Sequence, residues 1–169
     1  MTRAPFQIAA LEGSHDRSRF SCGEPALDRY LREQVTQDIR RRVAACFVAV
    51  TDELQIAGYY TLSTASVPLT DLPNVLRRKL PRYAAVPAIR MGRLAVDGTF
   101  KGKGLGSALL ANALRRAIAA EIPAAVLIVD AKDDQAADFY RHHGFIELGS
   151  DPLHLFLPLA TAKTLLSVR

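Results

Sequence analysis

The sequence predicts a single domain built on a parallel or mixed α/β sheet. The chain of 169 residues fits one hydrophobic core, so residues 1–169 are taken as one domain. Its apolar fraction of 49% and charged fraction of 23% are those of ordinary globular proteins. In the second half, strand-like and helix-like stretches alternate, and a glycine-rich loop joins one such strand to a long helix. This alternation is typical of sheets with parallel strands and helices packed against them.

Patterns in the first half predict a helix followed by a hairpin. Apolar side chains recur at helical spacing over residues 25–35, and the proline that opens this stretch suits a first helical turn. Residues 43–50 and 56–66 are rich in β-branched and aromatic side chains and are separated by a polar turn, which predicts two antiparallel strands. A short helix is expected over 70–80, and the prolines within 81–87 indicate a connector without regular structure.

The second half carries the alternation of strands and helices. A strand over 90–96 precedes the glycine loop, and an alanine- and leucine-rich helix is expected over 104–122. A continuous apolar strand follows at 124–129, and then a helix over 135–143 that ends at a glycine. The last predicted elements are strands over 145–148 and 153–157 and a helix over 159–168.

Composition excludes several classes of protein. No stretch of about 18 apolar residues could span a bilayer, and the N-terminus lacks a secretory signal pattern, so a cytoplasmic protein without a membrane partner is expected. Cys22 and Cys46 are expected to be free thiols, because a core of this size needs no disulfide. The four histidines show no ligand spacing, and no metal is predicted.

A glycine loop is the strongest chemical signal. Residues 100–107 have the sequence FKGKGLGS and lie between a strand and a long helix. The N–H groups of such a loop and of the helix N-terminus converge on one point, which favours an anion. Glycine has no Cβ to hold a phosphate away from the backbone, and Lys101 and Lys103 add positive charge. A simple tight turn remains the alternative, and the spacing fits neither GxxxxGKS/T nor GxGxxG.

Two motifs in order resemble those of the GNAT superfamily of acetyltransferases. The segment MGRLAVDGTFKGKGLGSALL is similar to the family's acetyl-CoA motif, with Lys101 where glutamine or arginine is usual. The segment DDQAADFYRHHGF is similar to the second family motif, with Asp133 at its asparagine position.

This resemblance implies a GNAT fold and acetyl-CoA as co-substrate. The fold would be a central, mixed and mostly antiparallel sheet, splayed between two parallel strands and flanked by helices. The pantetheine arm would lie along the first of these strands, and the pyrophosphate in the glycine loop. The implied acetyl-CoA-binding residues are Leu94, Ala95, Val96, Lys101, Gly102, Lys103, Gly104, Leu105, Gly106, Ser107, Asp133 and Ala136.

Tyr140 is the candidate catalytic residue. A phenol with a reference pKa of about 10 is protonated at pH 7, whereas a thiol titrates near about 8.5, so the tyrosine can protonate a departing thiolate. It would therefore act as an acid. The alternative is that Tyr140, like Phe139, only packs a short helix. No Ser-His-Asp or Cys-His arrangement suggests a covalent intermediate, which favours direct transfer, and no general base is evident.

The first half resembles a narrower group, the TacT-like GNAT toxins of bacterial toxin–antitoxin pairs. FSCGEPALDRYL and GYYTLS carry this resemblance together with the basic connector. It implies acetylation of the α-amine of aminoacyl-tRNA, which blocks translation, a ribbon-helix-helix antitoxin as partner, and a possible homodimer. Residues 72–103 hold eight basic side chains against one acid, and Lys and Arg contacts to phosphates suit tRNA. The candidate tRNA contacts are Arg77, Arg78, Lys79, Arg82, Arg90 and Arg93.

Three interpretations remain open at this point. The first is the aminoacyl-tRNA acetylating toxin, which predicts tRNA binding. The second is a GNAT enzyme acting on a protein N-terminus, a lysine or a small amine, which predicts indifference to tRNA. The third is an acyl-CoA-binding module without turnover. The basic run over 72–103 could also be a solvated face.

Overall fold

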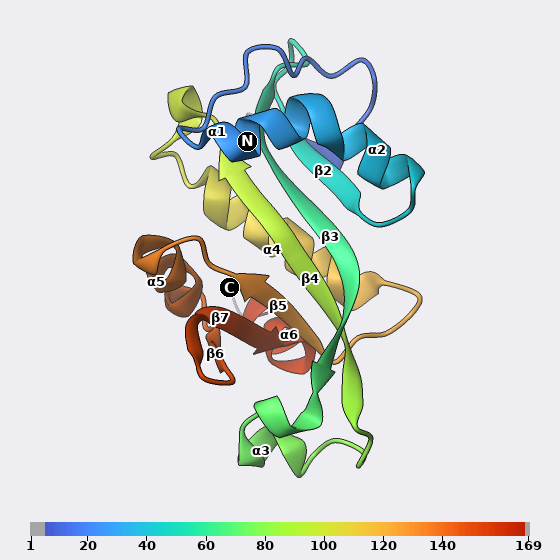
Figure 1. Cartoon of the computed structure of the whole chain (residues 1–169). Coiled ribbons are helices and arrows are strands. Elements are labelled where there is room, and N and C mark those ends of the chain that lie inside the picture. The colour runs from blue at the N-terminus through green and yellow to red at the C-terminus, as the bar shows by residue number, and fades with distance from the viewer. Residues whose placement is uncertain (1–5, 168–169) are drawn as a thin grey trace. The chain divides into compact units, whose positions relative to one another are not determined.

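The computed structural model describes residues 6–167, and its strands form a seven-stranded sheet in the order β1-β2-β3-β4-β5-β7-β6 (Figure 1). β4 and β5 pair in parallel, whereas β1 with β2, β2 with β3, β5 with β7 and β6 with β7 pair antiparallel. The sheet is therefore mixed and mostly antiparallel. Its strands are β1 (Gln7–Ala10), β2 (Ala45–Val50), β3 (Ile56–Pro68), β4 (Ala85–Val96), β5 (Val126–Asp130), β6 (Ile146–Leu148) and β7 (Asp151–Pro158).

Helices flank the sheet between these strands. A π-helical turn, η1, joins α1 to α2, and the tyrosine at its start is buried. No helix in residues 6–167 is long and apolar enough to cross a membrane. The helical elements are α1 (Pro25–Arg29), η1 (Tyr30–Gln34), α2 (Val35–Arg40), η2 (Leu69–Asp71), α3 (Asn74–Arg77), η3 (Gly98–Phe100), α4 (Leu105–Ala119), α5 (Asp134–His142) and α6 (Leu159–Ser167).

The described chain divides into two compact units. The first contains residues up to 63 together with 92–113, and the second contains 64–91 together with 114 onward. A cluster around Tyr59, Leu31 and Phe20 forms a core of the first unit, and the Tyr59 hydroxyl donates a hydrogen bond of 2.7 Å to the Leu27 carbonyl. A cluster around Ile128 and Phe156 forms a core of the second unit. The glycine loop belongs to the first unit and Tyr140 to the second.

Most predicted elements are confirmed. The helix predicted over 25–35 continues through η1 to Arg40, and the two strands after it pair as the predicted hairpin. The predicted strands and helices after the glycine loop are all present, although the helix over 104–122 ends earlier, at Ala119. The last helix was predicted to reach Val168, which lies outside the described residues.

Three details of the prediction are wrong. The helix over 70–80 is shorter, because Pro73 separates η2 from α3 and proline can begin a helix but cannot lie inside one. Pro87 is not in a connector: it lies within β4, where its carbonyl accepts a hydrogen bond from the Ala125 N–H. β1 was not predicted, because its four residues contain no strong strand pattern.

Candidate active site

The glycine loop, residues 101–107, has the backbone that its sequence predicts. Gly102 and Gly104 have φ angles of +80° and +77°, a left-handed region that side chains other than glycine rarely adopt. A Cβ built at either position would have no atom within 4 Å, so the space beside the loop is open. The first-turn N–H groups of α4 follow directly at Leu105 and Gly106, and helix first turns have no internal partners for these donors. The loop thus joins open space beside two glycines to the first-turn donors of a helix, which suits an anion.

A buried carboxylate fixes the start of this loop. Asp97 is 4% exposed and accepts hydrogen bonds of 2.9 Å from the N–H groups of Ser21 and Thr99. The Gly98 N–H in turn donates to the Ser21 carbonyl at 2.9 Å. Sequence reasoning missed Asp97, since its partner Ser21 is 76 residues away. The segment that enters the loop is therefore tied to the N-terminal part of the first unit.

The two lysines of the loop have different surroundings. The Lys101 ammonium donates a hydrogen bond of 2.6 Å to the Cys22 carbonyl, so this cation holds the loop against the N-terminal segment. Lys103 is exposed, and its ammonium lies 5.6 Å from the centre of the Phe100 ring. Lys103 is thus the more available of the two for a bound phosphate.

The strand before the loop supplies the backbone of the predicted pantetheine site. Leu94 and Val96 are half-buried, whereas the Ala95 side chain is 5% exposed and packs into the core around Tyr59. Alternate residues of a strand point to opposite faces, so only the backbone of Ala95 is available to a ligand.

Tyr140 is a buried phenol in α5. It is 7% exposed and its ring lies 5.5 Å from that of Phe145. Burial raises the pKa of Tyr140, so the hydroxyl stays protonated at neutral pH. Within residues 6–167 no hydrogen-bond partner contacts this hydroxyl, whereas the hydroxyls of Tyr30, Tyr59 and Tyr60 donate to Asp38, Leu27 and Asn112. The Tyr140 oxygen is not among the fully buried atoms, so its hydroxyl can donate to water or to a ligand.

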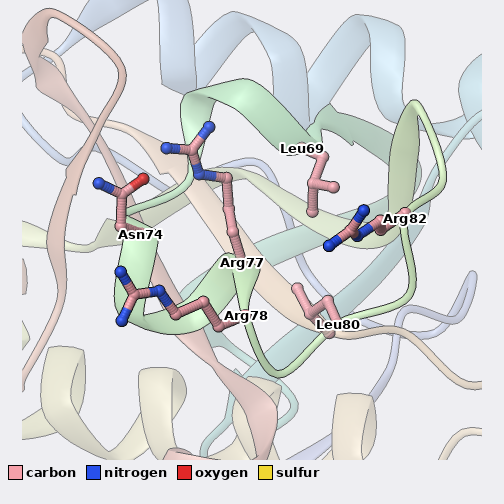
Figure 2. Close-up of a pocket in the computed structure, with 6 residues that line it drawn as sticks. All are labelled: Leu69, Asn74, Arg77, Arg78, Leu80 and Arg82. Carbon is pink, nitrogen blue, oxygen red and sulfur yellow. The ribbon is translucent and has the colours of Figure 1, made fainter.

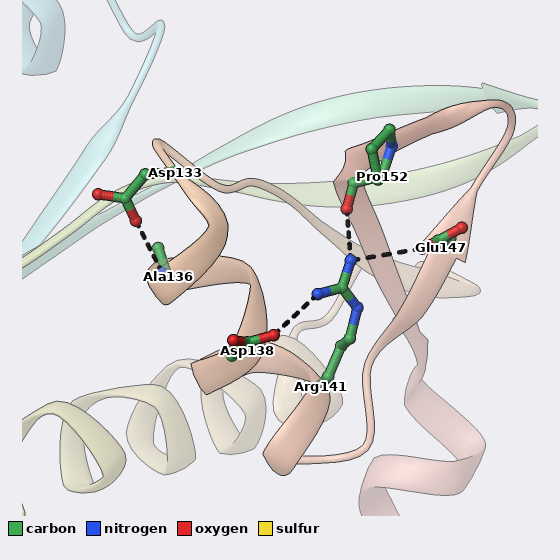
Figure 3. A network of polar contacts seen from close by, with 6 residues as sticks. All are labelled: Asp133, Ala136, Asp138, Arg141, Glu147 and Pro152. Carbon is green, nitrogen blue, oxygen red and sulfur yellow. Dashed lines mark hydrogen bonds and ion pairs between the residues drawn. The ribbon is translucent and has the colours of Figure 1, made fainter.

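Polar contacts hold α5 at both ends (Figure 3). The Asp133 carboxylate caps the helix by accepting a hydrogen bond of 2.8 Å from the Ala136 N–H. At the other end, the Arg141 guanidinium donates to the Pro152 carbonyl at 2.9 Å and to the Glu147 carboxylate at 3.3 Å, and also contacts Asp138. Arg141 thus ties the turn that carries Tyr140 to the β6–β7 hairpin.

Three of the predicted basic residues line one hollow of the second unit. Its volume is about 610 Å³, and its lining residues are Leu69, Asn74, Arg77, Arg78, Leu80 and Arg82. Figure 2 shows the three guanidinium groups on α3 and on the loop that follows it, with the leucines beside Arg82. We call this the arginine hollow. It combines three cations with an apolar wall and no acid among its lining residues, and Lys79 is exposed in the same segment.

The other two predicted tRNA contacts are engaged within the protein. The Arg90 guanidinium forms an ion pair with Asp130. Arg93 lies in the first unit, with its guanidinium carbon 3.4 Å from the centre of the Tyr30 ring. Arg90 and Arg93 thus each have a partner within the protein, whereas Arg77, Arg78 and Arg82 line the arginine hollow.

Comparison with known proteins decides the family. The model of the acetyltransferase (GNAT) family matches residues 10–145, which is most of the chain. The chain belongs to the GNAT acetyltransferases. It is therefore an acyltransferase, with the mixed sheet expected of this family.

Individual relatives of this GNAT acetyltransferase are toxins. A tRNA-acetylating toxin of Mycobacterium tuberculosis (strain ATCC 25618 / H37Rv) is 38% identical over 165 residues, which covers 96% of both chains. A protein of Sinorhizobium fredii (strain NBRC 101917 / NGR234) with the name probable toxin TacT is 29% identical, with 90% of both chains covered. The predicted resemblance to TacT-like toxins is confirmed.

Solved structures of toxins have the same fold as this acetyltransferase. A tyrosine-to-phenylalanine mutant of KacT has a TM-score of 0.90 at 29% identity, covering 96% of this chain and 99% of that one. AtaT complexed with acetyl-methionyl-tRNAfMet has a TM-score of 0.88 at 31% identity, covering 95% and 99%. A tyrosine-to-phenylalanine mutant of AtaT bound to the C-terminus of the antitoxin AtaR and acetyl-CoA has a TM-score of 0.82 at 27% identity, covering 97% and 99%.

Proposed function

We propose that this GNAT acetyltransferase is a toxin that transfers an acetyl group from acetyl-CoA to the α-amine of aminoacyl-tRNA and so blocks translation in the cytoplasm. The observation that carries the proposal is the 38% identity, over 96% of both chains, to a protein known as a tRNA-acetylating toxin. The proposal treats the described units as one catalytic domain. Each part of the reaction then has residues suited to it.

The acetyl donor binds at the glycine loop and the strand before it. The N–H groups of residues 102–107 bind the pyrophosphate, since the space beside Gly102 and Gly104 is open and the first turn of α4 follows directly. Lys103 adds charge, while Lys101 holds the loop through the Cys22 carbonyl. Backbone groups of Leu94 and Val96 bind the pantetheine arm. Asp133 and Ala136, which form the capped first turn of α5, also contribute to binding of acetyl-CoA.

Transfer is direct, and Tyr140 is the general acid. The amine nitrogen forms a bond to the acetyl carbonyl carbon, the C–S bond breaks, and the sulfur receives a proton from the Tyr140 hydroxyl. Three properties of Tyr140 support this role: its ring is buried, its hydroxyl is protonated at neutral pH, and this hydroxyl has no hydrogen-bond partner in residues 6–167 while its oxygen stays accessible.

The arginine hollow binds tRNA phosphates. Guanidinium groups form paired hydrogen bonds with phosphate oxygens, and three of them around one hollow suit a folded or bent stretch of RNA backbone. Leu69 and Leu80 offer an apolar wall for a ribose or base. Lys79 adds a neighbouring cation. Arg90 and Arg93 are not assigned to this surface, because Asp130 and the Tyr30 ring engage them.

The protein partner is a ribbon-helix-helix antitoxin, and the toxin forms a homodimer. The support is the likeness to AtaT, solved with the C-terminus of the antitoxin AtaR. Co-expression with the reading frame next to the toxin gene, followed by size-exclusion chromatography with light scattering, measures both assemblies. A toxin that stays monomeric and binds no product of a neighbouring frame would remove this part of the proposal.

The test of the catalytic assignment is Tyr140→Phe. Removing the hydroxyl while keeping the ring is expected to lower the rate of acetyl transfer to charged tRNA by about 10²-fold or more. The affinity for CoA and the unfolding midpoint should stay as in wild type, because the hydroxyl bonds no described residue. Wild-type turnover by this variant would show that Tyr140 only packs α5.

The test of the tRNA surface removes Arg77, Arg78 and Arg82 together by substitution with Ala. Acetylation of charged tRNA should weaken, and its dependence on salt should become less steep by about one unit for each lost phosphate contact. CoA affinity should not change. The matched control replaces Arg40, Arg41 and Arg42 with Ala. This triple substitution removes the same amount of charge from the end of α2. Equal losses in both triple variants would make the effect one of net charge alone.

One outcome would replace the proposal as a whole. If the wild-type protein acetylates no charged tRNA but modifies a peptide N-terminus, a lysine or a small amine, the enzyme is a GNAT of the ordinary kind. Binding of acetyl-CoA without any transfer would make it a binding module instead.

A further inference from the structure

A threonine hydroxyl in β3 has no partner within the described part of the protein. The Thr61 side chain is 2% exposed, and its hydroxyl makes no hydrogen bond within residues 6–167. No fully buried polar side-chain atom in these residues lacks a partner, so the Thr61 oxygen is partly accessible. This hydroxyl can therefore bind water or a ligand, although the rest of its side chain belongs to the core.

The accessible side of the hydroxyl faces Gly92 of β4. A Cβ built on Gly92 would have one atom within 4 Å outside the neighbouring residues, the Thr61 hydroxyl oxygen at 3.2 Å. Gly92 is exposed, and its φ lies outside the left-handed region, so its backbone conformation does not require glycine. What glycine provides is room. A ligand atom in the place of that Cβ would lie at hydrogen-bonding distance from the Thr61 oxygen.

The alternation of side chains along β4 is broken at Gly92. Thr61 follows Tyr59 by two residues, so both side chains point to one face, and Ala95 packs into the core on that face. Strict alternation would direct Gly92, three residues before Ala95, to the opposite face, yet it is directed at Thr61. The ladder between β4 and β5 also ends just before it, at Met91. Such an irregularity is typical of a β-bulge, and bulges are frequent beside active sites.

The open space beside Gly92 belongs to the same unit as the proposed donor site. Thr61, Gly92 and the glycine loop all lie in the first unit. The proposed arm of acetyl-CoA extends from the glycine loop back along β4, past Val96 to Leu94. Gly92 is two residues further in the same direction, about 7 Å from Leu94 along the strand. The thioester end of the arm is therefore directed toward Gly92, and the acceptor amine has to approach there.

We propose that the Thr61 hydroxyl binds the α-amine of the aminoacyl group and holds it for attack on the acetyl carbon, in the room that Gly92 leaves. The proposal rests on the proposed function, which supplies the acetyl donor and the amine. A hydroxyl oxygen has two lone pairs and accepts a hydrogen bond from an amine N–H. This bond fixes the direction of the nitrogen lone pair, and a nucleophile oriented about 3–3.5 Å from the carbon reacts faster.

The experiment compares Thr61→Val with Thr61→Ser in the full-length enzyme, with acetyl-CoA and methionyl-tRNA as substrates. Valine resembles threonine in shape but lacks the hydroxyl, so we expect kcat/KM for methionyl-tRNA to fall about tenfold. Serine keeps the hydroxyl, and its kcat/KM should stay within about threefold of wild type. Titration with CoA should give an unchanged affinity in both variants. The matched control is Thr64→Val, which removes an exposed hydroxyl from the same strand and should change neither quantity.

Gly92→Ala tests the room beside the hydroxyl by a second change. Its Cβ would take the place of the ligand atom, so kcat/KM for methionyl-tRNA should again fall about tenfold. Because both substitutions remove the same contact, the double variant should lose little more than either single variant. The control is Gly13→Ala, whose Cβ would meet nothing within 4 Å and which should keep the wild-type rate.

Stability separates this role from a structural one. Thr61→Val should unfold at no lower urea concentration than wild type, because the hydroxyl has no partner to lose among residues 6–167. Wild-type kcat/KM in Thr61→Val or in Gly92→Ala, an equal loss in Thr61→Ser, or additive losses in the double variant would each overturn the proposal. A loss of CoA affinity that accounts for the whole effect would also overturn it, since Thr61 would then bind the donor. Failure of the proposed function is distinct, because the wild-type enzyme itself would then leave methionyl-tRNA unmodified.

Discussion

The substitution Gly104→Ala tests the glycine loop through its backbone alone. Gly104 has a φ of +77°, and a Cβ there would meet no atom within 4 Å, so the methyl group creates no clash inside the protein. The left-handed conformation costs an L-residue about 1–2 kcal/mol. This free energy must appear either as lower stability, if the loop keeps its shape, or as weaker CoA binding, if the loop relaxes and its N–H groups turn away.

The expected sum of the two losses is therefore about 1–2 kcal/mol, equivalent to a factor of about 5–30 in an equilibrium constant. Urea unfolding measures the loss of stability, and isothermal titration with CoA measures the loss of binding free energy. Gly13→Ala is the matched control, because its Cβ would also meet nothing within 4 Å and its backbone lies outside the left-handed region. If Gly104→Ala changes neither quantity, the loop does not need its left-handed glycine and the anion-site argument fails.

Two further predictions concern α5. Asp133→Ala removes the hydrogen bond from the Ala136 N–H and should lower the unfolding free energy by about 1 kcal/mol. Asp133→Ser should retain most of this stabilisation, because serine can also cap a helix. Denaturant titrations of the two variants measure the difference. Arg141→Gln releases the helix from Pro152 and Glu147 and should lower kcat, by as much as about 10²-fold if Tyr140 moves by about 1 Å, with little change in the KM for acetyl-CoA. The control variant is Arg115→Gln, which changes an exposed arginine of α4, and both variants are measured by steady-state kinetics. Equal kinetic constants in the two variants would mean that Arg141 does not position Tyr140.

Local rules made much of the fold predictable. The helix from Pro25, the hairpin and the alternation after the glycine loop follow from periodicity, caps and turn residues that lie within a few positions of one another. The predictions were wrong at two prolines, because proline can occur inside a strand or before a helix as well as in a connector. Pro73 splits a predicted helix, and Pro87 lies in a strand whose partner is some 40 residues away, at β5.

Parts of the candidate site could likewise be predicted from local sequence, and other parts required the structure. Gly102 and Gly104 could be assigned from sequence because the conformation they permit is a property of the residue itself. Tyr140 could be singled out from its motif, but the observation that its hydroxyl has no partner within residues 6–167, unlike those of three other buried tyrosines, required the structure. The contacts by which Asp97 and Lys101 fix the loop to residues 21 and 22 could not be predicted, because no local pattern pairs positions more than 70 residues apart.

The sequence by itself determined the family, the reactive motifs and the excess of positive charge over residues 72–103. Only the tertiary structure decided what each of those charges contacts. Arg77, Arg78 and Arg82 line an open hollow, Arg90 holds Asp130 against His154, and Arg93 lies on the Tyr30 ring. The physical reason is that a conformational preference belongs to a residue and its near neighbours, whereas an ion pair depends on which distant strands the sheet places side by side.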